Sequence, residues 1–212
     1  EKMLNAALDR FEKSELVQVP MVNRAKLPVT VAERLVTLVS SKLQDVLVQK
    51  HDLPAGMAAD LIMQSRERAT VNLFDGASEN DVQRLVQQLY ANSRLTPSLT
   101  LRAACMGDMA FLEWAFALLA DVNITNARML IHDAGPLGFK SLYERTGMPK
   151  ALQQAFRVAV EVARETRLDG EEGDRERYRR RMIERILTQY EDLAAEDVDY
   201  LLNKLGNLAR AA

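Results

Sequence analysis

The residues best able to do chemistry are two histidines, His51 and His132, and a single cysteine, Cys105. A nucleophilic site needs a nucleophile, a base and an orienting carboxylate within hydrogen-bond reach. His132 is followed by Asp133, but adjacency in sequence does not establish that geometry. The chain contains no Gly-x-Ser-x-Gly, Walker or His-Glu-x-x-His motif, which would indicate a hydrolase, a nucleotide site or a metalloprotease. We therefore expect no catalytic residue and a protein that is not an enzyme.

The sequence also offers little for metal or redox chemistry. Zinc sites gather Cys and His at short spacings, whereas the histidines and the cysteine lie far apart in this chain. Cys105 ends an apolar stretch, which predicts a buried thiol, because free cysteine is among the most buried residue types. A single cysteine cannot form an internal disulfide and is typical of a reducing compartment. We expect no metal ion, no cofactor and a cytoplasmic location.

The composition excludes further classes of protein. Of 212 residues, 48% are hydrophobic and 27% are charged, and the formal net charge is -2. These values are ordinary for a water-soluble domain with a sizeable core. Nucleic-acid binders are usually strongly basic, so we do not expect one here. No signal peptide or membrane-spanning run is present, and a start at Glu1 instead of methionine leaves open whether a segment precedes this sequence.

The most unusual loop is the sequence HDAGPLG at 132–138. A proline near the first helical position would leave the next backbone amides free, and such a helix start can bind an anion. The simpler interpretation is that glycine lets neighbouring segments pack closely. The alternative is a site for a phosphate or carboxylate, to which charged residues on the same helix would contribute. The residues of this predicted ligand site are His132, Gly135, Gly138, Lys140 and Arg145.

A second charged stretch, RERYRRRMIER at 175–185, contains six arginines. Acidic residues inside it and before it match these arginines, which favours a solvated helix with ion pairs at i,i+3 and i,i+4 spacing. The alternative is a surface that grips an acidic partner, because the planar donors of arginine suit that role. Binding of nucleic acid through this stretch is the weakest alternative. The predicted partner-binding residues are Arg177, Tyr178, Arg179, Arg180 and Tyr190.

The candidate site residues must be held in position by helices. The stretch 108–120, DMAFLEWAFALLA, predicts the central helix. Its apolar residues point in every helical direction, so the helix must be enclosed on all sides. It is too short to cross a bilayer, which needs about 20 apolar residues. Asp108 is the predicted N-cap. We expect this helix to lie inside the domain.

The rest of the chain also shows helical spacing, and no stretch has the period of two that a strand needs. The six prolines, Pro20 among them, stand at or before the start of a helical pattern and not inside one. Ser40 and Ser41 predict a break between two short helices.

Capping residues support the same interpretation. Thr30 and Glu33 have the spacing of a capping box, in which each side chain bonds the other's amide. Thr96 precedes a proline and predicts an N-cap, as does Asn123 or Thr125 further along.

A Leu-Pro or Thr-Pro start followed by two helices recurs from Leu27, Leu53 and Thr96 at irregular spacing. This predicts an all-α fold of stacked antiparallel helical pairs, an α-solenoid of the HEAT kind. The predicted parts are a helical-repeat domain over 1–168 that contains helix 108–120, a flexible loop over 169–173, and a C-terminal helical hairpin over 174–212 packed on the domain. The hairpin predicts either a packing face or a homodimer contact through Tyr178, Met182, Tyr190, Leu202 and Leu205.

Several short sequence elements carry a resemblance to known proteins. They are Gly107-Asp108 with Phe111, Ile131-His132-Asp133, Gly135-Pro136-Leu137-Gly138, Leu53-Pro54 with Ala58-Ala59-Asp60-Leu61, and the arginine-rich helix that ends in Tyr190-Glu191. With these elements the chain resembles a bacterial family of uncharacterised proteins with HEAT-like helical pairs, known as a domain of unknown function. The resemblance covers roughly Leu27 to Leu208 and implies the helical fold without implying catalytic residues.

We predict a non-enzymatic protein-interaction or scaffold module with an unknown protein partner. Stacked helices present extended surfaces that suit this role. The first alternative is a sensor for a small anion at Gly135–Gly138, and the second is a weak nucleic-acid adaptor.

Overall fold

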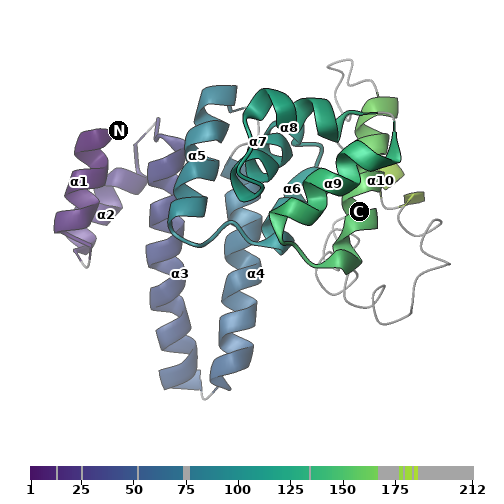
Figure 1. Cartoon of the computed structure of the whole chain (residues 1–212). Coiled ribbons are helices and arrows are strands. Elements are labelled where there is room, and N and C mark those ends of the chain that lie inside the picture. The colour runs from purple at the N-terminus through teal and green to yellow at the C-terminus, as the bar shows by residue number, and fades with distance from the viewer. Residues whose placement is uncertain are drawn as a thin grey trace. The chain divides into compact units, whose positions relative to one another are not determined.

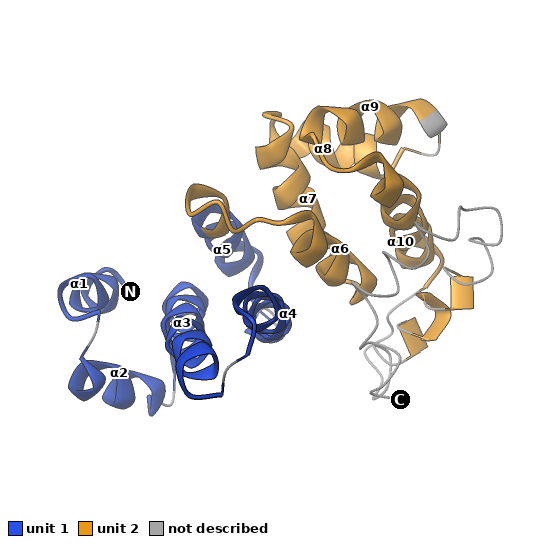
Figure 2. Ribbon diagram, turned by 90° about the horizontal axis from the view of Figure 1, so that it is seen from below, with its two compact units in different colours: residues 1–88 blue, residues 89–212 orange. Residues whose placement is uncertain are grey.

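The structure is a computed structural model. It describes residues 1–12, 14–24, 26–51, 53–73, 77–133, 135–166, 177–178, 180–182 and 184–185. These residues form helices and turns without a strand, which confirms the predicted all-α class. The chain divides into two compact units, unit 1 from Glu1 to Gln88 and unit 2 from Leu89 to Ala212, coloured blue and orange in Figure 2. The predicted loop at 169–173 lies outside the described residues, so the predicted boundary there stays a prediction.

Unit 1 is built on a long antiparallel helix pair, α3 and α4, which pack along each other (Figure 1). The bounds of its helices are α1 (Lys2–Arg10), α2 (Glu15–Val22), α3 (Val29–His51), α4 (Ala55–Leu73) and α5 (Glu79–Ala91), whose last residues belong to unit 2. A small apolar core joins α1 and α2 to the first turns of α3, and it consists of Leu8, Met21, Val31 and Leu35.

Helix α3 runs without interruption, so the predicted break at Ser40 and Ser41 was wrong. The Ser40 hydroxyl donates to the carbonyl of Val36 at 2.6 Å, and that of Ser41 donates to the carbonyl of Thr37 at 3.1 Å. These bonds satisfy both hydroxyls inside the helix, which therefore need not end. Neither α3 nor any other described helix combines the length and the apolar character needed to cross a membrane.

Two other local predictions in unit 1 were also wrong. Thr30 lies inside α3, and its hydroxyl donates to Glu1 Oε1 at 2.8 Å, while Glu33 Oε2 accepts from Gln88 Nε2 at 2.8 Å. The two side chains thus connect α3 to other parts of unit 1 instead of forming a capping box. Pro20 lies inside α2, where its missing N–H removes one helical hydrogen bond.

Unit 2 follows as a series of shorter helices. Their bounds are α6 (Pro97–Cys105), α7 (Met109–Leu119), α8 (Ile124–Ile131), α9 (Pro136–Thr146), a 3-10 turn (Lys150–Leu152) and α10 (Gln153–Glu165). The Thr96 hydroxyl accepts from the Leu99 amide at 3.1 Å, and Asn123 Oδ1 accepts from the Thr125 amide at 2.7 Å. Both predicted N-caps are confirmed, with Asn123 as the cap of α8.

Helix α7 lies at the centre of unit 2, as its apolar sequence predicts. The ring of Phe116 packs edge-on against Phe156 of α10, with centroids 5.3 Å apart, and against Tyr143 of α9 at 5.8 Å. Enclosure is not complete, because Trp114 on the same helix is only partly buried. Asp108 is the N-cap residue of α7, as predicted, but its side chain does not make the expected capping hydrogen bond.

Candidate functional site

Part of the arginine-rich stretch lies against the core of unit 2. Tyr178 and Met182, four residues apart on one helical face, are 2% and 1% exposed. The Tyr178 hydroxyl lies 3.2 Å from the carbonyl oxygens of both Ala104 and Ala159, in α6 and α10. Burial raises the pKa of the Tyr178 phenol well above its ordinary value, so the hydroxyl stays protonated and can donate. Tyr178 therefore anchors this stretch inside unit 2 and does not offer a surface to a partner.

The Tyr178 ring packs against Gly107. Its φ of +87° is in the left-handed region, and a Cβ built on it would lie 3.3 Å from Tyr178 Cε1. Both the backbone conformation and the close ring contact favour glycine at this position. The turn between α6 and α7 is thus complementary in shape to the side chain of Tyr178.

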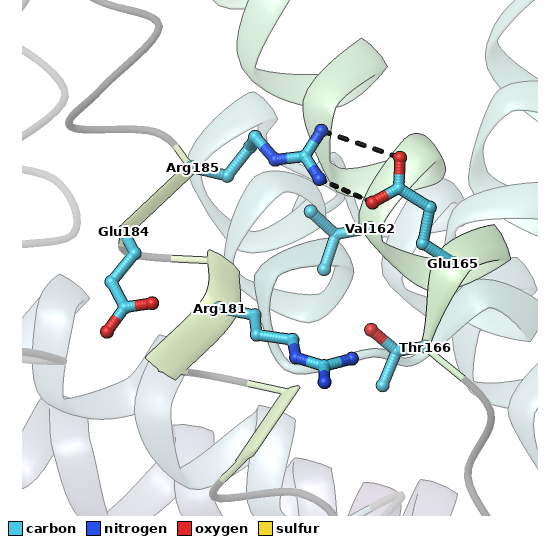
Figure 3. A pocket seen from close by; sticks show the side chains of 6 residues that line it. All are labelled: Val162, Glu165, Thr166, Arg181, Glu184 and Arg185. Atoms are coloured by element: carbon cyan, nitrogen blue, oxygen red, sulfur yellow. Dashed lines mark hydrogen bonds and ion pairs between the residues drawn. The ribbon is translucent and has the colours of Figure 1, made fainter.

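The anchored stretch and the end of α10 enclose a pocket of about 330 Å³ (Figure 3). Val162 forms an apolar part of its wall, and the other lining residues are polar or charged. Those residues are Glu165 and Thr166 from the end of α10, and Arg181, Glu184 and Arg185 from the anchored stretch.

Most charges in this pocket are paired. Arg185 forms a two-pronged ion pair with Glu165, in which Nη1 lies 3.5 Å from Oε1 and Nη2 bonds Oε2 more closely. Glu184 pairs with Arg180 at 3.5 Å, at the i,i+4 spacing that the sequence predicts. Arg181 has no hydrogen bond or ion pair with any residue that the structure describes.

The other predicted partner-binding residues are only partly described. Arg177 and Arg180 are exposed, as a partner-binding surface requires. Arg179 and Tyr190 lie outside the described residues, as do Leu202 and Leu205 of the predicted dimer contact. Met182, like Tyr178, is buried within unit 2, so neither is available for the predicted homodimer.

The predicted ligand site at the start of α9 is covered by a side chain of the chain itself. The Gly135 amide donates to Asp133 Oδ1 at 3.2 Å, and a Cβ on Gly138 would lie 2.6 Å from Asp133 Oδ2. Gly138 thus provides room for the Asp133 carboxylate, which agrees with the simpler interpretation of close packing. A carboxylate here also suits the partial positive charge of a helix N-terminus.

His132, which we predicted for this ligand site, faces a different group. Its Nε2 lies 2.7 Å from Glu113 Oε1, and Arg128 Nε lies 2.7 Å from Glu113 Oε2. Glu113 is a buried carboxylate of α7, and both of its partners come from α8 and its C-terminal cap. The cluster therefore neutralises a buried charge and connects α7 to α8.

The remaining predicted ligand residues lie along α9. Lys140 pairs with Glu144 at 4.0 Å, and Arg145 is exposed in the last turn of the helix. Arg145 follows Gly135 by ten positions, which separates them by roughly 15 Å along a helix. The structure does not bring these two residues to one point.

Unit 1 contains a second hollow, an open apolar groove between α2 and α3 with a volume of about 490 Å³. Its apolar side chains are largely exposed, with values of 55% for Val39 and 49% for Leu43. At its rim, Lys42 forms an ion pair with Glu15 that lowers the pKa of the Glu15 carboxyl, through the hydrogen bond first and the charge second. The apolar lining consists of Val19, Val22, Val39, Leu43 and Val46.

Sequence reasoning missed both hollows. The groove had a signal, because Val39, Leu43 and Val46 follow at i, i+4 and i+7, but the break predicted at Ser40 and Ser41 divides this stripe between two helices. The pocket had none, because its two sides are far apart in the sequence. Cys105 is buried as predicted, and burial raises the pKa of its thiol to about 12. Within the described ranges, no group of three or more His, Cys, Asp or Glu residues is arranged to hold a metal ion.

Comparison with known proteins gives one match, to a family model. The model described as an uncharacterised protein conserved in bacteria (DUF2336) matches residues 1–196. No curated protein and no solved structure matches the chain. Since the family model spans nearly all of the sequence, the chain belongs to this bacterial family.

Proposed function

We propose that this chain is a non-enzymatic protein-interaction module and that the groove between α2 and α3 receives an amphipathic helix of a partner protein. The observation that carries the proposal is the exposed apolar lining of that groove. Contiguous apolar surface is costly in water, and on soluble proteins it often marks a binding site.

The arrangement of the lining supports a helix as the bound element. Val39, Leu43 and Val46 form one stripe along α3, and Val19 and Val22 face it from α2. An apolar groove lined from two helices can receive the apolar face of a third helix, whose anchors lie at i, i+3, i+4 and i+7. The charges of the rim, Glu15 and Lys42, are paired with each other and would remain satisfied when the groove is filled.

The same lining supports binding in preference to catalysis. It contains one carboxylate and one ammonium in mutual contact, with apolar and amide side chains around them. Neither a thiol nor an imidazole lines the groove, so it lacks a ready nucleophile or a general base other than Glu15.

We extend the proposal to a stacked, HEAT-like arrangement of helical pairs. Its support is the long antiparallel pair α3 and α4, and the packing of α6 on α7, α7 on α8 and α8 on α9 in chain order. Such stacks present grooves between successive helices as binding surfaces.

Site-specific photo-cross-linking tests the proposed function. A photoreactive residue replaces Leu43 in the groove and, in a control protein, replaces Met129, an exposed residue of α8. In cells of the native host, we expect a discrete adduct from position 43 that is absent from position 129. Mass spectrometry of the adduct should place the cross-link on an amphipathic helix of another protein. Adding Val39→Glu should abolish that adduct, because it places a charge in the apolar groove.

Two outcomes would contradict the proposal. Equal adducts from positions 43 and 129 would indicate non-specific contact. A cross-link at position 43 that survives Val39→Glu would show that the apolar lining does not determine binding.

A further inference from the structure

We propose that the pocket between the end of α10 and residues 181–185 binds a small molecule through a carboxylate or phosphate group held by Arg181 and Thr166. This site lies in unit 2 and is independent of the groove proposed above. It also differs from the start of α9, where Asp133 already supplies a carboxylate.

The pocket has the size and character of a small-molecule site. Its volume of about 330 Å³ is at the lower end of the range for ligand pockets, roughly 300 to 1,000 Å³. Val162 supplies an apolar wall for the carbon skeleton of a ligand. Arg185 extends toward Glu165 and Arg181 toward Thr166, while Glu184 points away from them (Figure 3).

The charge pattern selects an anion. Glu165 is neutralised by Arg185, and Glu184 is paired with Arg180. Arg181 is then the one lining cation without an interaction among the described residues. A single oxyanion group would complete the neutralisation of the pocket. Arginine can hold a carboxylate or a phosphate with two parallel N–H donors.

The Thr166 hydroxyl is the second observation. Its Oγ1 is buried and has no hydrogen-bond partner among the described residues, although its backbone amide donates to Val162 at 2.9 Å. A buried hydroxyl without a partner is unfavourable, so such groups usually mark a missing water or ligand. In Figure 3 the Arg181 side chain extends toward Thr166, so one oxyanion could accept from both.

The surrounding packing holds these two groups in place. Tyr178 and Met182 are buried on either side of Arg181 in the sequence, so the backbone that carries Arg181 is anchored. Thr166 directly follows α10, a helix whose inner face is part of the core. A site built on anchored segments requires little reorganisation on binding.

The test is isothermal titration of the full chain with inorganic phosphate and, separately, with succinate, at an ionic strength held constant with potassium chloride. We expect saturable one-to-one binding of at least one probe. Binding of phosphate alone indicates a phosphorylated ligand, and binding of succinate alone indicates a carboxylic acid. Arg181→Gln should weaken the affinity about tenfold or more, since it removes a charged two-donor contact.

A neighbouring substitution provides the matched control. Arg164→Gln removes the same charge from an exposed position on α10 that does not line the pocket, so the affinity should change less than about twofold. Thr166→Val keeps the shape and removes the hydroxyl, and should weaken binding about fivefold. If circular dichroism shows that the Arg181→Gln protein is misfolded, the Thr166→Val variant tests the proposal in its place.

The proposal is overturned if neither probe saturates, or if Arg164→Gln weakens binding as much as Arg181→Gln. Failure here leaves the groove of unit 1 untouched, because the two experiments use different surfaces and different binding partners.

Discussion

Helices α3 and α7 use apolar side chains in opposite ways. In α7, Leu112 and Phe116 are completely buried in the core of unit 2. In α3, every buried residue lies within the first two turns, and the apolar residues Val39 and Leu43 further along are about half exposed. The chain thus has one helix whose apolar surface builds a core and another whose apolar surface remains available.

This difference separates stability from recognition. Burial of apolar area contributes to folding only where the folded chain itself covers that area. The covered residues of α7 have already made that contribution, whereas the open stripe of α3 can contribute when a partner covers it. Substitutions in the two helices should therefore divide cleanly between loss of stability and loss of binding.

The largest expected effect is at the centre of α7. Leu112→Ala should lower the free energy of unfolding by about 3 to 5 kcal/mol, because it removes a fully buried side chain and leaves a cavity. Urea denaturation followed by circular dichroism measures the change. A loss below about 1 kcal/mol would mean that α7 is not the core helix and would break the comparison.

The anchor of the arginine-rich stretch should have an intermediate effect. Tyr178→Phe leaves the ring in place but removes the donor to the carbonyls of Ala104 and Ala159, which should cost about 1 to 2 kcal/mol of unfolding free energy. The same substitution at Tyr90, which is 48% exposed, should change the stability by less than about 0.5 kcal/mol. Equal effects at both positions in thermal unfolding would show that the buried hydroxyl contributes nothing specific.

Sequence predicted those parts of the fold that local rules decide. Thr96 and Asn123 cap helices because their side chains reach amides two or three residues away. The apolar surface of α7 required burial, whatever its partners. The predictions at Ser40 and Pro20 were wrong for the same reason. Each residue weakens a helix on its own, but a packed unit tolerates a hydroxyl bonded to the preceding turn and the loss of a single hydrogen bond.

The candidate sites were less predictable because they depend on contacts between distant residues. The ion pair of Glu165 with Arg185 spans 20 positions, and nothing in the local sequence indicates which arginine will remain without a partner. Similarly, His132 lay beside the glycine loop in sequence, but its contact is with Glu113 one helix earlier. The pattern identified the arginine-rich stretch as notable, and only the packing of Tyr178 determined which of its side chains line a pocket.

A smaller effect is expected in the groove. Leu43→Ala removes the same atoms as the substitution in α7, but Leu43 is 49% exposed and should change the unfolding free energy by no more than about 0.5 kcal/mol. The partner adduct formed by a photoreactive residue at Val46 should nevertheless decrease strongly in this variant. Destabilisation comparable with that of Leu112→Ala would mean that the stripe is part of the core after all.

The smallest effect concerns the rim of the groove and is visible only in a titration. Lys42 lowers the pKa of Glu15 below its ordinary value of about 4.5, so the folded state holds the Glu15 proton less tightly than the unfolded chain does. The pair therefore favours folding above the pKa of the unfolded state, and this contribution disappears as the pH falls through the lower pKa of the folded state. Lys42→Ala should raise the Glu15 pKa back toward its ordinary value in a carbon-detected NMR titration, while Lys50→Ala should not change it. Since both partners are exposed, added salt should produce the same upward shift. If neither Lys42→Ala nor added salt changed the pKa of Glu15, the ion pair at the rim would play no part in the groove. The apolar stripe would then be the sole basis for recognition by α3.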